Sequence, residues 1–242
     1  MVETTGILYG ISVGTGDPDL ITVKGVRILQ RVSVVAFPMG LGQQLGIAEQ
    51  IISPWIKATQ QKLPLFFPYV RDHEQLQQAW REAASQVWQY LQQGKNVAFA
   101  CEGDVSFYST FTYLAQTLKK LHPQLKIEMI PGVCSPLAVA SVLKIPLTVS
   151  NQRLAVIPAL YHLELLESVL TTADVVVLLK VSSVYSQVWQ VLHNFRLLEQ
   201  SWVVERATQP DQIIYANLSD RPHLDLSYFS LLIVQVNPSA PL

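Results

Sequence analysis

Residues 7–19 have the sequence Ile-Leu-Tyr-Gly-Ile-Ser-Val-Gly-Thr-Gly-Asp-Pro-Asp, which predicts a buried strand followed by a glycine-containing loop. The apolar part is shorter than a typical helix and ends directly at turn-forming residues. The next segment, Ile21–Gln30, predicts a helix because its apolar residues recur every three or four positions. A strand, a loop and a helix in this order are typical of an α/β fold.

The alternation of strand and helix patterns continues along the chain. Further strands are predicted at Ser33–Phe37, Asn96–Cys101, Lys126–Ile130, Leu154–Pro158, Asp174–Leu179, Ser201–Glu205, Ile213–Ala216 and Tyr228–Val236. Further helices are predicted at Ile47–Ile56, Glu74–Gln92, Tyr108–Leu121, Ser135–Leu143, Leu163–Thr171 and Val184–Phe195. Strands follow one another closely near the C-terminus, so the second half is expected to contain a mixed sheet.

A polar segment near the midpoint of the chain, His122-Pro123-Gln124, is the best candidate for a linker. It predicts an N-terminal α/β domain over residues 1–121 and a C-terminal α/β domain over residues 125–242. A chain of 242 residues is long enough for two domains of ordinary size.

The composition excludes several classes of protein. Half of the residues are hydrophobic and 14% are charged, which favours a globular chain with a substantial core. The net charge of −1 and the scattered basic residues argue against a nucleic-acid-binding protein, which needs a clustered basic face. Cys101 and Cys134 are predicted to be reduced, buried thiols. No apolar run is long enough to span a bilayer and no basic segment precedes residues 7–13, so we expect a cytoplasmic protein without membrane contact.

Four loops share an unusual composition and each follows a predicted strand. They are Gly14–Asp19, Glu102–Ser106, Pro131–Ser135 and Glu205–Asp211. Ligands of doubly wound sheets bind outside the carboxyl ends of the strands. Glycine lets the backbone approach a ligand closely, so these loops predict recognition largely through main-chain groups.

Common nucleotide and metal sites are disfavoured. Asp19 replaces the third glycine of a dinucleotide-binding motif, and the second strand ends at Pro38 where that motif places an acid. No Gly-Lys-Ser/Thr sequence is present, which excludes a P-loop, and the histidines lack metal-ligand spacing. Taken alone, the first loop is equally consistent with a structural Asp-Pro turn.

Together the loops resemble the motifs of the tetrapyrrole methylase family, the S-adenosylmethionine-dependent enzymes that build corrins and sirohaem. Gly14–Gly25 resembles the N-terminal motif of the family, and Glu102–Thr110 resembles the second motif. Ile130–Ser135, followed by Leu143–Leu147, resembles the third, and Glu205–Asp211 resembles a fourth. The order and spacing match from about Gly10 to Val236.

The resemblance implies two α/β domains with a cofactor cleft between them, and a homodimer. The residues expected from the family motifs to contact S-adenosylmethionine, or S-adenosylhomocysteine after transfer, are Pro38, Glu102, Gly103, Asp104, Ser106, Thr110, Phe111, Pro131, Val133, Ser135, Val181 and Ala207. The residues expected near the tetrapyrrole are Gly14, Gly16 and Asp17, with Lys24, Arg153 and Arg206 as candidate partners of its carboxylates.

The form Glu-Gly-Asp-Val-Ser-Phe-Tyr-Ser-Thr at residues 102–110 is similar to the branch that methylates carbon 20 of precorrin-2 or cobalt-factor II. Methyl transfer from a sulfonium needs mainly positioning, which agrees with the lack of a catalytic triad or a metal site. The candidate acceptors of the proton lost from carbon 20 are Asp17, Glu102 and Asp104. The alternatives are a tetrapyrrole methylase acting at a different ring carbon, an enzyme of this family acting on ribosomal RNA, or a non-catalytic module that binds S-adenosylmethionine or a tetrapyrrole. The absence of a basic patch weighs against RNA.

Overall fold

The computed structural model describes residues 5–40, 45–68, 70, 72–160 and 162–238. The chain forms two compact units, residues 1–134 and 135–242, and each is an α/β domain built on its own sheet. The predicted fold class of two α/β domains is confirmed.

The boundary between the units differs from the predicted linker at residues 122–124. It falls between Cys134 and Ser135, because the strand β5 (Ile127–Ile130) pairs with β1 (Leu8–Ser12) in the sheet of the first unit. A Pro-containing loop in the sequence marks a surface turn, but only strand pairing decides to which domain the next strand belongs.

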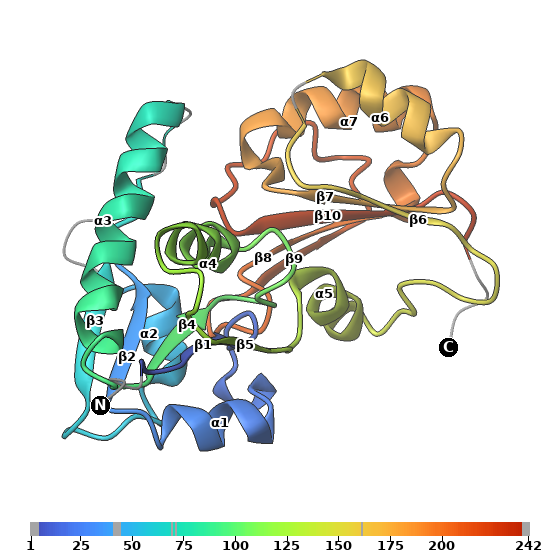
Figure 1. Cartoon of the computed structure of the whole chain (residues 1–242). Helices are drawn as coiled ribbons and strands as arrows, with labels where there is room; N and C mark the ends of the chain where they lie inside the picture. The colour runs from blue at the N-terminus through green and yellow to red at the C-terminus, as the bar shows by residue number, and fades with distance from the viewer. Residues whose placement is uncertain (1–4, 41–44, 69, 71, 161, 239–242) are drawn as a thin grey trace. The chain divides into compact units, whose positions relative to one another are not determined.

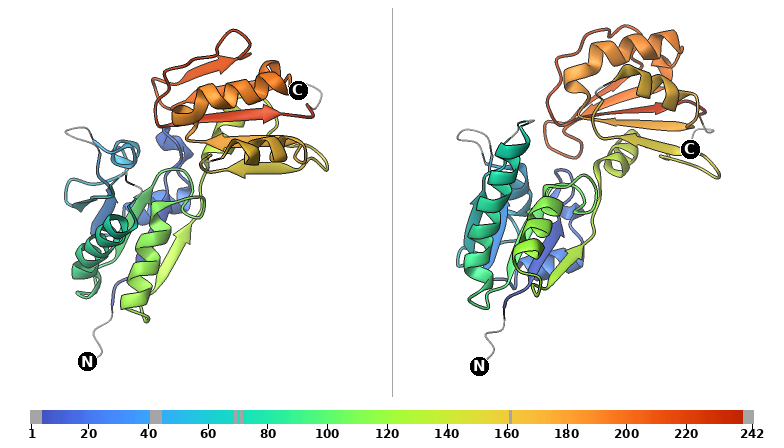
Figure 2. Two further views of the ribbon diagram at one scale, coloured as in Figure 1. Left: turned by 90° about the horizontal axis from the view of Figure 1, so that it is seen from above. Right: turned by 45° about the horizontal axis from the view of Figure 1, so that its top comes forward.

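The first unit contains a five-stranded parallel sheet. Its strand order is β3-β2-β4-β1-β5, and the remaining strands are β2 (Val34–Pro38), β3 (Gln61–Leu65) and β4 (Val97–Cys101). α1 (Val23–Leu29) and α2 (Ile47–Ile52) cover one face of the sheet. α3 (His73–Leu91) and α4 (Thr110–Leu121) cover the other face, as Figures 1 and 2 show. Parallel strands covered on both faces need apolar residues throughout, and every residue of β4 is buried.

The central strand β1 packs unusually close to α4. A Cβ atom added to Gly10 would lie 2.5 Å from the ring of Phe111, so only glycine leaves room for this ring. Phe111 is fully buried, as are Leu114 and Leu118 on the same side of the helix.

The strand β3 is not predicted by the sequence analysis. Its sequence, Gln-Lys-Leu-Pro-Leu, has two exposed polar residues and a proline, and it lacks a strong apolar pattern. It occupies the edge of the sheet beside β2. Proline lacks a backbone N–H, so it is tolerated on an edge strand, where one side of the backbone has no partner strand.

The second unit contains the mixed sheet that the sequence predicts. Its order is β6-β7-β10-β8-β9, with β6 (Leu154–Ile157), β7 (Val175–Leu179), β8 (Ser201–Glu205), β9 (Ile213–Ala216) and β10 (Ser230–Gln235). β6 is parallel to β7, whereas β10 is antiparallel to both β7 and β8. The carboxyl ends of β7 and β8 therefore lie at the same edge of this sheet. α6 (Leu163–Leu170) and α7 (Tyr185–Asn194) cover one face, and α5 (Ser135–Leu143) covers the other (Figure 1).

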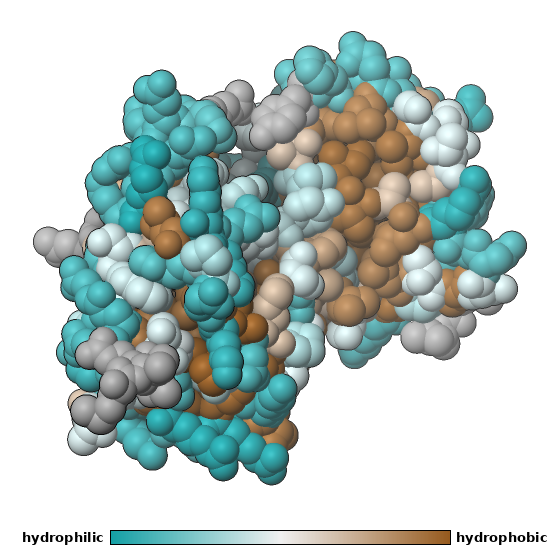
Figure 3. Space-filling model, viewed as in Figure 1, coloured by the Kyte–Doolittle hydropathy of each residue, from teal (hydrophilic) through white to brown (hydrophobic). Residues whose placement is uncertain are grey.

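The surface of the first unit agrees with the amphipathic pattern of its longest helix. The outer side of α3 carries glutamine, glutamate and arginine side chains and is hydrophilic in Figure 3. Within the described parts of the chain, no helix combines the length and apolar character needed to cross a membrane.

Candidate functional site

Two glycine-containing loops of the first unit are joined directly through their backbones. Gly14 follows β1, and Gly103 follows the neighbouring strand β4. The Gly103 N–H donates to the Gly14 carbonyl at 2.7 Å, and the Gly14 N–H donates to the Gly103 carbonyl at 3.2 Å. Both residues have a positive φ, +75° at Gly14 and +67° at Gly103, which glycine adopts without strain. The sheet thus brings together two of the predicted loops.

The carboxylate of Asp104 joins these loops to a third. Oδ2 accepts the backbone N–H of Gly132, which follows β5, at 2.8 Å. Oδ1 accepts both the backbone N–H and the hydroxyl of Ser106. Burial opposes ionisation, but these hydrogen bonds and one from Ser12 outweigh it and hold the pKa of Asp104 below its usual value. Asp104 is therefore an ionised, fully engaged acceptor that fixes the loops.

Glu102 has a different environment, although only two residues away. It is half-buried, and its carboxylate accepts the backbone N–H of Ala48 in the first turn of α2. Burial raises the pKa of Glu102 to about 7, and the hydrogen bond from Ala48 only partly opposes this effect. The pKa of Glu102 thus lies near neutral pH, which suits a group that exchanges a proton.

The third candidate carboxylate, Asp17, is exposed and serves a local turn. Its side chain accepts the backbone N–H of Asp19 at 2.9 Å and caps the short 3₁₀ turn Pro18–Leu20. Gly16 lies in the same loop and is half-buried. Lys24 is exposed on α1, in the helix that follows this loop.

The remaining candidates of the first unit differ in how accessible they are. Thr110 is the first residue of α4 and is half-buried, whereas the ring of Phe111 belongs to the core. Pro131 is exposed and Val133 is half-buried in the loop after β5. Pro38 is the half-buried last residue of β2.

In the second unit, two candidate residues lie at one edge of the sheet. Val181 follows β7 and Ala207 follows β8, and both are buried. The chain turns sharply at Lys180 and Arg206, which have φ values of +55° and +48°. Ser135 begins α5 in the same unit and is half-buried.

The side chain of Arg206 forms ion pairs within its own loop, residues 205–211. Its Nε lies 2.8 Å from Asp211 Oδ2, and its Nη1 lies 3.8 Å from Glu205 Oε2. Glu205 is only 2% exposed and also accepts the hydroxyl of Tyr215 and the backbone N–H of Ser227. The guanidinium is thus already paired with carboxylates of the protein.

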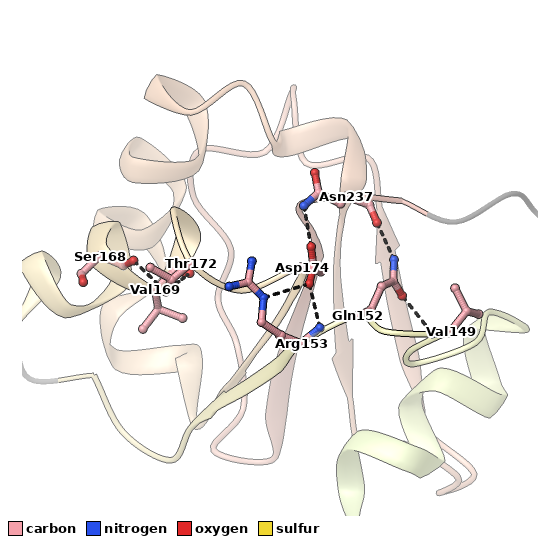
Figure 4. A network of polar contacts seen from close by, with 8 residues as sticks. All are labelled: Val149, Gln152, Arg153, Ser168, Val169, Thr172, Asp174 and Asn237. Atoms are coloured by element: carbon pink, nitrogen blue, oxygen red, sulfur yellow. Dashed lines mark hydrogen bonds and ion pairs between the residues drawn. The ribbon is translucent and has the colours of Figure 1, made fainter.

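The structure separates Arg153 from the other candidates of the second unit. Arg153 precedes β6, and its backbone N–H donates to Asp174 Oδ2 at 2.7 Å, with its Nε at 3.4 Å from the same atom (Figure 4). Asn237 donates to the other oxygen of Asp174 at 2.7 Å. Asp174 precedes β7, which is parallel to β6, so this network lies at the amino ends of the strands, opposite Val181.

The backbone at Gly103 has open space beside it. A Cβ atom added to Gly103 would meet one atom within 4 Å, Cys134 Cα at 3.9 Å, so the space beside this residue is open. In the described portion of the chain, no group of three or more His, Cys, Asp or Glu side chains is arranged to hold a metal ion. Two contributors to this site, Ser12 and Ala48, are not among the residues predicted from the sequence. Ser12 is a polar residue within the apolar run 7–13 and is fully buried in the structure. A polar residue inside a predicted buried strand needs a hydrogen-bond partner, and this is the sequence signal that could have identified it.

The fold and these loops define a two-domain α/β protein in which the four motif loops follow the carboxyl ends of strands. The sequence model described as Tetrapyrrole (Corrin/Porphyrin) Methylases matches residues 7–221. The chain belongs to the tetrapyrrole methylase family, and the resemblance noted from its loop motifs is confirmed.

Several relatives carry informative names. The chain is 31% identical over 233 residues to the cobalt-precorrin-2 C(20)-methyltransferase of Salmonella typhimurium, with 95% of this chain and 96% of the relative covered. It is 28% identical to the precorrin-2 C(20)-methyltransferase of a Sinorhizobium species, with 95% of both chains covered. Among solved structures, a cobalt-precorrin-4 methyltransferase superposes with a TM-score of 0.72 at 24% identity over 96% of both chains. A Thermus thermophilus uroporphyrin-III C-methyltransferase in complex with S-adenosylhomocysteine gives a TM-score of 0.68 at 20% identity, covering 95% of this chain and 92% of that one. Both structures share the fold of this protein.

Proposed function

We propose that this protein transfers a methyl group from S-adenosylmethionine to carbon 20 of precorrin-2, or of its cobalt-containing counterpart, in cobalamin biosynthesis. The names of the relatives from Salmonella and Sinorhizobium support this reaction, since the similarity extends over nearly the full length of each chain. The observation that carries the proposal is the backbone pairing of Gly14 with Gly103, together with the hydrogen bond that Gly132 donates to the neighbouring Asp104, because these contacts bring three of the motif loops together.

S-adenosylmethionine would supply an electrophilic methyl group, so the protein needs mainly to hold and orient the two reactants. In the first unit, we assign the methionine and ribose contacts to the loop 102–106 and the segment 131–133, with Pro38 and Thr110 beside them. The open space at Gly103 supports this assignment, since a ligand can approach its backbone there. In the second unit, we assign the adenine contacts to the backbone of Val181 and Ala207, with Ser135 as a further cofactor residue.

The environments of the three candidate carboxylates favour different roles. Glu102 has a pKa of about 7 and one backbone hydrogen bond, so we assign it as the acceptor of the proton from carbon 20. Asp104 is held ionised by its hydrogen bonds and fixes the loops, which makes it a positioning residue. Asp17 caps a turn, and with Gly14 and Gly16 we place it at the edge of the tetrapyrrole site.

The tetrapyrrole carries carboxylates that need cationic or hydrogen-bonding partners. Lys24 is exposed on α1 immediately after the Gly14–Asp19 loop, so we propose it as one of these partners. Arg206 is already paired with Asp211, and Arg153 is paired with Asp174 at the far edge of its sheet, which makes both less suited to this role.

An incubation with methyl-labelled S-adenosylmethionine tests the reaction. Purified protein is supplied with precorrin-2 or with cobalt-factor II, and the position of the label in the product is determined by NMR. Label at carbon 20 is expected, and the faster substrate identifies the natural one. Label at another ring carbon would replace the assignment by that of a different tetrapyrrole methylase. No label in either product, with the cofactor bound, would favour a non-catalytic binding module.

We further propose that the protein acts as a cytoplasmic homodimer that binds neither nucleic acid nor membranes. A net charge of −1 with scattered basic residues supports the absence of nucleic-acid binding. Sedimentation equilibrium at micromolar concentration tests the dimer, and a mass near 27.1 kDa, that of one chain, would contradict it.

A further inference from the structure

Ser12 occupies a central place in the sheet of the first unit. It is the last residue of β1, which lies between β4 and β5, and its side chain is fully buried. Within the sheet, Ser12 pairs with Cys101 at the end of β4, and its neighbour Ile11 pairs with Ile130 at the end of β5. The Ser12 side chain is thus a buried polar group at the place where three adjacent strands end.

The hydroxyl of Ser12 forms hydrogen bonds to both neighbouring segments. It accepts the backbone N–H of Val105, in the loop after β4, at 2.9 Å. It donates to the backbone carbonyl of Ile130 at 2.7 Å. A serine hydroxyl has one proton, so the longer contact of 3.3 Å to Asp104 Oδ2 is secondary to the bond with Ile130.

The segment after β5 packs directly against Ser12. A Cβ atom added to Gly132 would lie 2.5 Å from the Cβ of Ser12, so the third loop rests directly on this side chain. Val105 and Ile130 are each 1% exposed. Without the hydroxyl, the buried N–H of Val105 would lose its partner without access to water.

We propose that Ser12 is a positioning residue that sets the loop 102–106 against the segment 131–133 in the conformation that receives S-adenosylmethionine. The inference rests on the proposed function, because it assigns these loops to the cofactor. Ser12 acts through other residues: its hydroxyl fixes Val105, and Val105 adjoins Asp104, whose carboxylate holds Gly132 and Ser106.

The proposal makes a specific kinetic prediction. In Ser12→Ala the two loops lose the hydrogen bonds of the hydroxyl that connects them. Part of the binding free energy of the cofactor is then used to order the loops, which weakens binding. We expect the Kd and the KM for S-adenosylmethionine to rise about tenfold, while kcat at saturating cofactor stays within about twofold of wild type. A residue that only stabilises the fold would change the melting temperature without this separation between KM and kcat.

Ser201→Ala provides a matched control. Ser201 is also fully buried in a strand and donates one hydrogen bond, at 2.7 Å, to the carbonyl of Leu197. It begins β8 in the second unit, at the edge of the sheet opposite Ala207. We expect this variant to lower the melting temperature and to leave cofactor affinity unchanged.

The experiment measures cofactor binding by isothermal titration calorimetry with S-adenosylhomocysteine, steady-state kinetics and thermal unfolding for the three proteins. Ser12→Cys is added because sulfur fills the space of the hydroxyl but is a weak hydrogen-bonding group. It is expected to weaken binding in the same direction, and it keeps the test available if Ser12→Ala does not fold. Wild-type affinity in the folded Ser12 variants, or an equal loss of affinity in Ser201→Ala, would overturn the inference. A wild-type protein that binds no cofactor would instead refute the proposed function, and the inference with it.

Discussion

Replacing Glu102 by glutamine is expected to stabilise the protein at alkaline pH and to reduce its activity. Glutamine keeps an oxygen that accepts the N–H of Ala48, but it cannot ionise. The pKa of Glu102 is about 7 in the folded protein, compared with 4.5 for an unperturbed glutamate. Between these pH values the folded protein binds more protons than the unfolded chain, so the free energy of unfolding falls as the pH rises.

The interval from 4.5 to about 7 sets the size of this effect. At 1.36 kcal/mol per pH unit it corresponds to at most about 3 kcal/mol. The contribution of Glu102 is most favourable below pH 4.5 and is lost progressively up to about pH 7. Glu102→Gln should therefore be more stable than wild type by up to about 3 kcal/mol at pH 8, and the difference should shrink as the pH falls toward 5.

Urea-induced unfolding at pH 5, 6, 7 and 8 measures this difference. Glu167→Gln is a suitable control, because Glu167 is exposed on α6 in the second unit. The control should show the pH profile of wild type. A stability difference between wild type and Glu102→Gln that is the same at every pH would refute the idea that burial holds the carboxyl partly protonated.

The activity of Glu102→Gln tests the catalytic role of this carboxyl group independently of its effect on stability. If Glu102 accepts the proton from carbon 20, kcat should fall about 10²-fold or more, since general-base catalysis contributes factors of this order. The affinity for S-adenosylhomocysteine should change much less. An unchanged kcat would remove Glu102 from the chemistry and leave its pKa as a consequence of burial alone.

Three further predictions concern single positions. Gly103→Asp should fold, because little surrounds an added Cβ and aspartate tolerates a positive φ better than most residues. The variant should not bind the cofactor in calorimetry, and wild-type affinity would exclude this loop from the site. Gly10→Ala should cost about 1–3 kcal/mol in chemical denaturation, because its methyl group would overlap the ring of Phe111; an unchanged midpoint would show that the ring moves freely. Arg153→Ala should leave the KM for the tetrapyrrole within about twofold of wild type, because the guanidinium is paired with Asp174 away from the loops; a large increase would restore Arg153 as a substrate ligand.

Local sequence patterns predicted most of the secondary structure. Ser135–Leu143, Ser201–Glu205 and Ile213–Ala216 agree residue for residue with α5, β8 and β9. These elements have clear apolar periodicity or β-branched runs, which depend on nearby residues only. β3 was missed because its pairing with β2 stabilises it, and its own sequence contains a proline and exposed polar residues.

The sequence by itself determined the α/β class, the mixed sheet of the second half and the loops that carry the family motifs, since each is encoded by residues close together in the chain. The tertiary structure decided how these loops work together. Ser12 meets Val105 and Ile130 across 93 and 118 residues of sequence, and this contact exists only because β1 lies between β4 and β5. The different ionisation of Glu102 and Asp104 likewise depends on how much protein surrounds each carboxylate and on hydrogen bonds from distant segments, Ala48 to Glu102 and Gly132 to Asp104, in addition to the local bonds from Ser106.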